Sequence, residues 1–276
     1  MIKIWIDGAL VPAHEARVPV SNHGLTVGDG MFETMKVVGN TAFAIRRHLA
    51  RLHRTADGLG LTLPYDDDAL RDAIDTTIVA NQPGAGWARV TVTGGPSLSG
   101  SARGDSPATV VIQCGPVTAW SAAADVITVP WPRNERGALA GLKTTSYAEN
   151  VVARERARAA GAEEALFANT VGSLCEGTGS NVFVGLDGQL LTPPLASGCL
   201  AGITRELLLE LDLPIVEEDV AMGALTNADE AFLTSSTRDV QPIGAIDGVG
   251  IARCPGPLTI AARDAFAALQ EQTLDP

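Results

Sequence analysis

Apolar and polar residues alternate with a period of two in several short segments, which is the pattern of half-buried β-strands. Residues 2–7 (IKIWID) show this alternation first. Residues 34–38 and 42–45 show it on either side of Gly39-Asn40, which predicts a hairpin. The same pattern predicts further strands at 87–94, 108–114, 125–130, 164–168, 181–185 and 230–235.

The apolar period changes to that of a helix after the predicted hairpin. Leu49, Leu52, Ala56 and Leu59 recur at helical spacing, and Gly60 follows as a stop signal. The same spacing predicts helices over 67–80, from about 146 to 160, from about 203 onward and over 258–270. Because strands come in runs with helices between the runs, we expect an α+β protein rather than one doubly wound sheet.

A shift in composition at 115–124 (GPVTAWSAAA) predicts a linker between two domains. We expect a small N-terminal α/β domain at 1–114 and a larger domain at 125–276. The Gly/Ser-rich segment 94–107 joins two predicted strands and is long for a hairpin loop. Long ordered loops often carry function, so this segment is a candidate part of a site.

Composition and charge exclude several classes of protein. Apolar residues make up 46% of the 276 residues, enough to fill a core, and the formal net charge is -12. An acidic chain repels nucleic acid and anionic membranes. No apolar run approaches the ~20 residues of a spanning helix, and no signal peptide is evident. The four cysteines show no CxxC spacing, so we expect reduced thiols and a cytoplasmic location.

Several common catalytic motifs are missing from the sequence. The histidines are His14, His23, His48 and His53, and the last two are five apart, so they do not share a helix face for metal binding. We therefore expect no metal site. The segment 177–182 (GTGSNV) lacks the last glycine of a dinucleotide fingerprint, and there is neither a phosphate-binding GxxxxGK[ST] loop nor a GxSxG nucleophile elbow.

Lysine is scarce, which draws attention to one position. The chain contains Lys3, Lys36 and Lys143 and no other lysine. Lys143 follows small and apolar residues at 138–142 and precedes the uncharged residues 144–146. An apolar site lowers the pKa of a lysine and allows it to form a Schiff base with an aldehyde. Taken alone, an ordinary solvated lysine is the alternative.

Two further features fit a phosphorylated aldehyde. The glycine-containing loop 198–202 leads into a predicted helix at Ile203 and Thr204, where free N–H groups favour a phosphate, and 235–237 (SST) adds hydroxyl donors. Glu176 is a lone carboxylate next to a glycine turn. A lysine, an anion site and a carboxylate are the three groups that pyridoxal 5′-phosphate (PLP) needs, because the carboxylate keeps the pyridine nitrogen protonated.

Six motifs in order resemble the fold-type IV PLP enzymes, a family that includes D-amino-acid transaminases, branched-chain aminotransferases and 4-amino-4-deoxychorismate lyases. The resemblance spans nearly the whole chain and implies a two-domain α+β fold like that of D-amino-acid aminotransferase. The motifs are GDGMFET (28–34), HLARL (48–52), LKTTSYAENV (142–151), EGTGSNVF (176–183), LAGITR (200–205) and TSSTRDVQPI (234–243).

The resemblance implies a role for each matching position. Lys143 is similar to the lysine that holds PLP and moves the substrate proton, and Glu176 to the carboxylate that pairs with the pyridine nitrogen. Arg51 resembles the phosphate-binding arginine, and Leu200 the residue that packs against the ring. The other implied cofactor-binding positions are Asn181, which would support the Glu176 turn, and Gly202, Ile203, Thr204, Ser236 and Thr237 around the phosphate.

Four positions are candidates for substrate selection. Arg103, in the Gly/Ser-rich loop, lies near where related enzymes place carboxylate-binding residues, although a solvated loop arginine is the alternative. Arg238 would either face the substrate or pair with Asp239. Phe32 stands where D-amino-acid transaminases often carry a tyrosine, and Thr34 is more typical of the lyase members.

Three functions remain open at this point. The first is transfer of an amino group from a D-amino acid, or an (R)-amine, to a 2-keto acid such as 2-oxoglutarate or pyruvate through a Lys143 Schiff base. The second is aminodeoxychorismate lyase chemistry, which yields p-aminobenzoate and pyruvate. The third is PLP binding without robust turnover. The resemblance also implies a homodimer with active sites at the domain boundary, to which N-terminal residues of the neighbouring subunit contribute.

Overall fold

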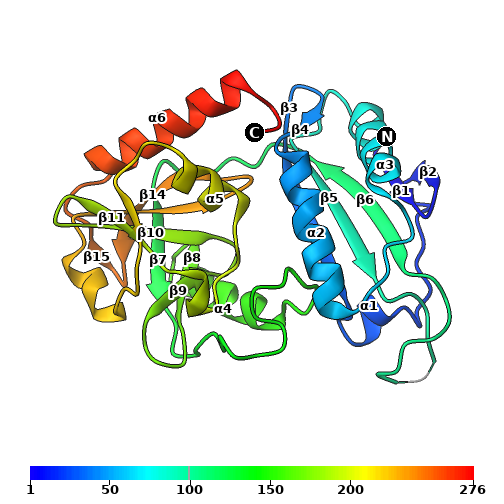
Figure 1. The fold of residues 1–276 in the computed structure, drawn as a ribbon, viewed down its shortest axis with the longest axis horizontal. Coiled ribbons are helices and arrows are strands. Elements are labelled where there is room, and N and C mark those ends of the chain that lie inside the picture. Colours follow the sequence, from blue (N-terminus) through cyan, green and yellow to red (C-terminus); the bar gives the residue numbers. More distant parts are fainter. Residues whose placement is uncertain (99) are drawn as a thin grey trace. The chain divides into compact units, whose positions relative to one another are not determined.

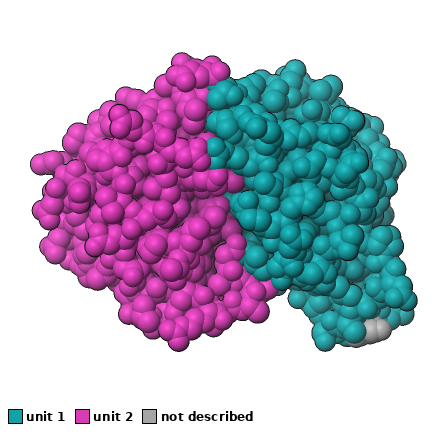
Figure 2. Space-filling view, viewed as in Figure 1, with its two compact units in different colours: residues 1–118, 142–147, 273–276 teal, residues 119–141, 148–272 magenta. Residues whose placement is uncertain are grey.

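The computed structural model describes residues 1–98 and 100–276, and these form two compact units (Figures 1 and 2). Unit 1 contains residues 1–118, 142–147 and 273–276, and unit 2 contains residues 119–141 and 148–272. The first crossing between units, after residue 118, falls inside the predicted linker. The units nevertheless differ from two consecutive domains, because two later segments belong to unit 1.

Unit 1 is built on a six-stranded sheet in the order β2-β1-β6-β5-β3-β4, and every neighbouring pair is antiparallel (Figure 1). Over most of their length its central strands bury alternate residues, as the period of two predicts. The strands are β1 (Lys3–Ile6), β2 (Ala9–Pro12), β3 (Gly30–Val38), β4 (Thr41–Ala42), β5 (Trp87–Thr93) and β6 (Thr109–Gly115).

Helices α2 (Ile45–Leu59) and α3 (Asp67–Ala80) supply the apolar side chains that cover this sheet, and the short helix α1 spans His23–Thr26. Leu49 and Leu52 of α2 join Met31 and Met35 of β3 in one buried cluster. Helix α2 ends as predicted at Gly60, whose φ of 63° is a left-handed conformation that glycine adopts easily.

The segment 142–147 belongs to unit 1 because its backbone pairs with β3. The N–H of Phe32 donates to the carbonyl of Lys143 (3.1 Å), and the N–H of Thr145 donates to the carbonyl of Gly30 (2.8 Å). Leu142 packs so closely against Gly58 of α2 that a Cβ at that glycine would collide with its side chain. Lys143 is therefore held between β3 and α2.

Unit 2 contains a nine-stranded mixed sheet in the order β12-β11-β10-β13-β14-β7-β8-β9, with β15 paired to β14. The β7–β14, β7–β8 and β11–β12 pairs are parallel. The strands are β7 (Ala124–Thr128), β8 (Glu164–Ala168), β9 (Leu174–Gly177), β10 (Asn181–Leu186), β11 (Gln189–Thr192), β12 (Ile215–Glu217), β13 (Glu230–Ser235), β14 (Asp239–Ile246) and β15 (Val249–Gly250).

Both faces of this sheet are covered. In β8, Ala165 and Phe167 pack with Ala153 and Ala157 of α4, whereas Leu166 belongs to the cluster on the other face. The helices of unit 2 are α4 (Ala148–Ala159), α5 (Ile203–Glu210) and α6 (Pro257–Gln272), with 3₁₀ turns at η1 (Leu195–Ser197) and η2 (Met222–Asn227). The expected α+β class is confirmed.

Strand β14 is the main element that the alternation does not predict. Pro242 has no N–H and Gly244 has no side chain, and both are rare in central strands. The strand nevertheless lies between β13 and β7, with a register shift between Ile243 and Ala245. Complete burial of Ile243 shows that packing, rather than local preference, determines this strand.

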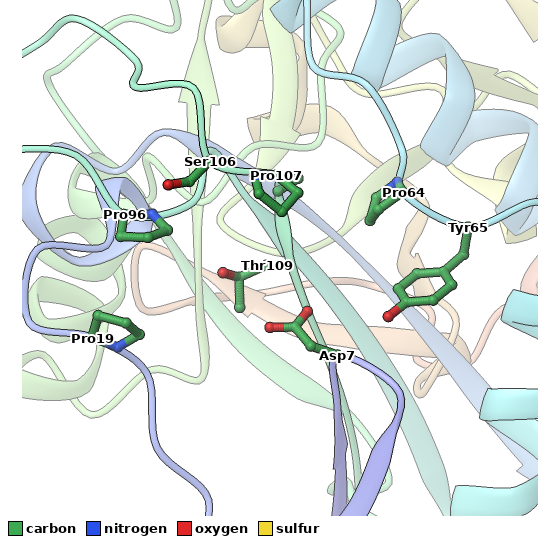
Figure 3. Close-up of a pocket in the computed structure, with 9 residues that line it drawn as sticks. Asp7, Pro19, Pro64, Tyr65, Pro96, Ser106, Pro107 and Thr109 are labelled. Carbon is green, nitrogen blue, oxygen red and sulfur yellow. The ribbon is translucent and has the colours of Figure 1, made fainter.

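Figure 3 shows a pocket of about 360 Å³ in unit 1. Four prolines line it together with Tyr65, Asp7 and Thr109. Asp7 accepts a hydrogen bond from the backbone N–H of Val110 (2.7 Å), so its carboxylate already supports the sheet. The pocket contains none of the residues that the sequence nominates for chemistry.

Within residues 1–98 and 100–276, no helix has both the length and the apolar character that a membrane span requires.

The start of α6 yields a prediction for stability. The carboxylate of Glu230, which is 2% exposed, accepts the N–H groups of Leu258 (3.2 Å) and Thr259 (2.6 Å). Glu230→Ala leaves these N–H groups without their acceptor, so we expect the free energy of unfolding to fall by about 2 kcal/mol. Urea titration measures this loss. Glu271→Ala, at an exposed position of the same helix, should change it by less than about 0.5 kcal/mol.

Candidate functional site

Strand β3 presents different chemistry on its two faces. Glu33 points toward α2, where it meets Arg51. Phe32 and Thr34 alternate with Glu33 and therefore point to the opposite face. Thr34 lies directly across from Arg89 of β5 in the sheet register, so Arg89 shares the face of Phe32 and Thr34.

The ring of Phe32 is the centre of a cluster of cations in unit 1. The Nζ atom of Lys143 lies 4.5 Å from the ring centroid, and the Cζ atom of Arg89 lies 3.7 Å from it. Tyr147 meets the same ring edge-on, with centroids 5.3 Å apart. Cations prefer the face of an aromatic ring, so Phe32 holds both side chains in place.

Arg89 has the properties of an anion-binding residue. Its side chain is half-buried, and this burial lowers the pKa of the guanidinium. Its Nε donates to the hydroxyl of Thr91 (3.2 Å). Among the described residues no carboxylate pairs with Arg89, so a half-buried positive charge is available to a carboxylate ligand.

A buried ion pair lies on the other face of β3. Arg51 donates from Nε and Nη2 to the two carboxylate oxygens of Glu33 (2.8 and 2.7 Å), and His48 Nδ1 lies 2.6 Å from the same carboxylate. Burial alone would raise the pKa of Glu33, but Arg51 and His48 outweigh it and lower the pKa to about 2. Burial lowers the pKa of His48. Arg51, the predicted phosphate ligand, is thus buried and paired with Glu33 through Nε and Nη2, which supply two of its five N–H donors.

Arg103 forms a different ion pair from the one that the sequence suggests. Its guanidinium donates to both oxygens of Asp29 (2.8 and 2.6 Å) and to the carbonyl of Gly60 (2.8 Å). The hydrogen bond from Arg103 lowers the pKa of Asp29. These contacts tie the Gly/Ser-rich loop to the rest of unit 1, and a role in binding substrate would require Arg103 to leave Asp29.

In unit 2, Glu176 and Asn181 hold the loop before α5 through a single residue. The N–H of Leu200 donates to Oε2 of Glu176 (2.9 Å), and the carbonyl of Leu200 accepts from Nδ2 of Asn181 (2.8 Å). A Cβ at Gly202 would collide with the side-chain oxygen of Asn181. Asn181, which follows the Glu176 turn in the sequence, therefore also supports the 200–202 loop by direct contact.

The start of α5 provides the predicted anion-binding groups. Its N-cap is Gly202, which has no side chain to accept the first helical N–H groups. Ile203 and Thr204, the first two helical residues, are buried. The turn with Ser236 and Thr237 follows β13, and it lies at the same end of the sheet because Thr234 pairs with Asn181 in register. These donors suit a phosphate.

Arg238 is buried inside unit 2. Its Nη2 donates to Glu164 (3.0 Å), a carboxylate that is completely buried, and its guanidinium stacks on the ring of Trp120 (3.9 Å from Cζ to the centroid). The structure thus pairs Arg238 with Glu164, and a contact with substrate would require breaking that pair.

Arg89, Arg133 and Glu33 are site residues that the sequence did not nominate. Arg89 is the charged residue inside the alternating segment WARVTVT, and this position could have drawn attention to it. A charge in a predicted sheet needs a partner or a ligand. Arg133 lies between the strand predicted at 125–130 and the helix predicted from about 146, and its ion pair with Glu176 arises from tertiary structure. No group of metal-ligating side chains occurs in the part of the chain that the structure describes.

The Glu33–Arg51 pair predicts a pH-dependent loss of stability. The pKa of Glu33 falls from 4.5 to about 2 on folding, so the unfolded chain binds the proton more tightly and the stabilisation is lost as pH falls through this range. Glu33→Gln should lower the free energy of unfolding by about 3 kcal/mol at neutral pH, because it leaves the Arg51 charge buried. The difference from wild type should shrink between about pH 5 and about pH 2.

Urea titrations across this pH range measure the difference. Glu15→Gln, at an exposed position, is the matched control and should follow wild type throughout. A difference that stays constant down to about pH 2 would contradict the role of the Glu33 charge.

Curated relatives cover nearly the whole chain. A putative branched-chain-amino-acid aminotransferase of Methanocaldococcus jannaschii is 31% identical over 90% of this chain and 88% of its own length. A D-alanine aminotransferase of Bacillus licheniformis is 29% identical over 99% of this chain and 98% of its own.

Solved structures are similar over the same length. The branched-chain aminotransferase of Thermoproteus uzoniensis has a TM-score of 0.88 at 32% identity, covering 97% of this chain and 94% of that one. A second branched-chain aminotransferase, from T.th. and solved with N-(5′-phosphopyridoxyl)-L-glutamate, has a TM-score of 0.86 at 28% identity, with coverages of 96% and 93%. A putative 4-amino-4-deoxychorismate lyase of Legionella pneumophila has a TM-score of 0.86 at 25% identity, with coverages of 94% and 96%.

The family model for class IV aminotransferases matches residues 30–246, which contain five of the six motifs in full and most of the first. The resemblance to fold-type IV enzymes is confirmed. By this match, and by its likeness to the relatives above, the chain belongs to the class IV aminotransferase family and has the fold-type IV architecture.

Proposed function

We propose that this protein is a PLP-dependent aminotransferase that moves the amino group of a D-amino acid to a 2-keto acid such as 2-oxoglutarate or pyruvate, with (R)-amines as a second donor class. One observation carries the proposal. Lys143 and Arg89 contact the same ring of Phe32, so an amine that reacts with an aldehyde lies in one cluster with a guanidinium suited to a substrate carboxylate.

The residues present fit PLP. Bound PLP supplies an aldehyde that reacts with amines and a protonated ring that withdraws electrons from the substrate Cα. Gly202, where a Cβ would collide with Asn181, has no side chain to accept the first N–H groups of α5, and such N–H groups suit the phosphate of PLP. We assign the phosphate to Ile203 and Thr204, Ser236, Thr237 and Arg51, the ring contact to Leu200, and the ring nitrogen to Glu176.

Lys143 has two tasks in this proposal. Its Nζ would hold the cofactor aldehyde, and as a free amine Nζ would move the proton from the substrate Cα. The Phe32 ring keeps Nζ in place and, because it is 6% exposed, keeps water from one side of it. Arg89 binds the substrate carboxylate and thereby orients Cα, while Phe32 and Thr34 shape the pocket beside it.

The amino-group donor is the most specific part of the proposal, and we assign it from the similar proteins. D-alanine aminotransferases are similar to this chain along nearly its full length, which supports a D-amino acid. Branched-chain enzymes are equally similar, so L-leucine is the competing donor to test. Aminodeoxychorismate lyase is the second candidate function, supported by Thr34, by the segment KTTSYAEN and by the similarity to the Legionella protein.

The proposal includes a homodimer, and light scattering can measure this oligomeric state.

The first test follows the visible absorption of the purified protein loaded with PLP. D-alanine should remove the absorption band of the bound cofactor, and 2-oxoglutarate should restore it. L-leucine and (R)-1-phenylethylamine are run in parallel. Lys143→Ala should lose turnover by at least about 1000-fold, because no other group is assigned to move the proton. A band that no amine changes, with release of p-aminobenzoate from aminodeoxychorismate, would establish the lyase instead.

The second test separates the two candidate carboxylate ligands of unit 1. Arg89→Gln should raise KM for D-alanine by about 10- to 100-fold, the loss expected for a charged hydrogen bond. Turnover of (R)-1-phenylethylamine, which has no carboxylate, should change by less than about threefold. Arg103→Gln is the matched variant, and it should affect both substrates alike because Arg103 pairs with Asp29. The reverse pattern would assign the carboxylate to Arg103.

A further inference from the structure

Arg133 of unit 2 contacts the carboxylate that we assign to the ring nitrogen. Its Nε lies 3.2 Å from Oε1 of Glu176, and the exposed fractions of the two side chains are 16% and 14%. The N–H is not aligned for a hydrogen bond to that oxygen, so the contact is an interaction of charges. The other oxygen, Oε2, accepts the N–H of Leu200 (2.9 Å).

Arg133 is itself fixed from three sides. Its backbone N–H donates to the carbonyl of Ala168 (2.7 Å). Its Nη1 donates to the side-chain oxygen of Asn150 (2.9 Å), and its Cζ lies 4.2 Å from the centroid of the Phe167 ring. Asn150 in turn donates to the carbonyl of Thr178 (2.6 Å), in the turn after Glu176. The guanidinium is therefore rigid with respect to β8, α4 and this turn.

A second carboxylate near Arg133 is a weak competitor. Glu149 lies 3.5 Å from Nη1, but its side chain is 77% exposed. An exposed ion pair contributes little free energy in water, whereas the attraction between two half-buried charges is screened much less by solvent and salt. Glu176 is thus the carboxylate on which the charge of Arg133 acts most strongly.

We propose that Arg133 is a positioning residue that keeps Glu176 ionised and fixed for pairing with the protonated ring nitrogen of PLP. The inference rests on the proposed function, since it assigns Glu176 to that nitrogen. A carboxylate pairs with a pyridinium only when it is ionised and aimed, and Arg133 supplies both conditions without itself being assigned a contact to the cofactor. Its effect therefore passes through Glu176 and disappears when Glu176 carries no charge.

A double-mutant cycle on cofactor binding tests this coupling. Apoproteins carrying Arg133→Gln, Glu176→Gln or both changes are titrated with pyridoxamine 5′-phosphate, which makes no covalent bond to Lys143. Arg133→Gln should weaken binding by about tenfold in the wild-type background and by less than about twofold in the Glu176→Gln background. Arg133→Lys, which keeps the charge, should bind within about threefold of wild type.

Arg136→Gln is the matched control, because it removes an arginine three residues away whose side chain is 82% exposed. It should change binding by less than about twofold. The midpoint of thermal unfolding of each apoprotein reports whether it is folded. If Arg133→Gln does not fold, Arg133→Lys is compared in both backgrounds, and any loss it causes should vanish with Glu176→Gln.

The outcomes separate this inference from the proposed function. Equal losses for Arg133→Gln with and without Glu176→Gln would mean that Arg133 acts independently of Glu176, and the proposal would be overturned. The same holds if any loss caused by Arg133→Lys persists in the Glu176→Gln background. A wild-type protein that binds neither PLP nor pyridoxamine 5′-phosphate would overturn the proposed function, and this inference with it.

Discussion

The pairing of residues 142–147 with β3 is the constraint on which the proposed chemistry depends. After residue 118 the chain enters unit 2, returns to unit 1 for these six residues and then leaves again. Backbone hydrogen bonds from Phe32 to Lys143 and from Thr145 to Gly30 set the register of the return. That register places the Lys143 side chain against the Phe32 ring and within the same cluster as Arg89.

Buried and half-buried carboxylates organise the polar groups of both units. Glu33 holds Arg51, Glu176 is contacted by Arg133, and Glu164 holds Arg238. A buried charge is costly unless it is paired, so each pair determines where its arginine can point. This explains why Arg51 and Arg238 lie fixed in the interior of their units, whereas Arg89, which has no such partner among the described residues, suits a ligand that brings its own carboxylate.

The periodic elements were predictable because their signal is local. Helix α3 spans 67–80 as expected, and β13 spans 230–235 as expected, since burial of one face leaves its period in the sequence. Strand β14 was missed because Pro242 and Gly244 hide its pattern, and its neighbours β13 and β7 supply the hydrogen bonds that its own residues do not suggest. Asn181 was expected to support the Glu176 turn, and its contact with Leu200 became visible only in the fold.

The sequence by itself determined the α+β class, the family and the order of the motifs around Lys143, Glu176 and Ile203, because these depend on residue type and on spacing along the chain. The tertiary structure alone decided which charges meet. Whether Arg103 faces Asp29 or a ligand, and whether Arg133 reaches Glu176, depends on contacts between residues that are 74 and 43 positions apart. Electrostatic attraction acts through space and leaves no period in the sequence, so only the folded chain shows these pairs.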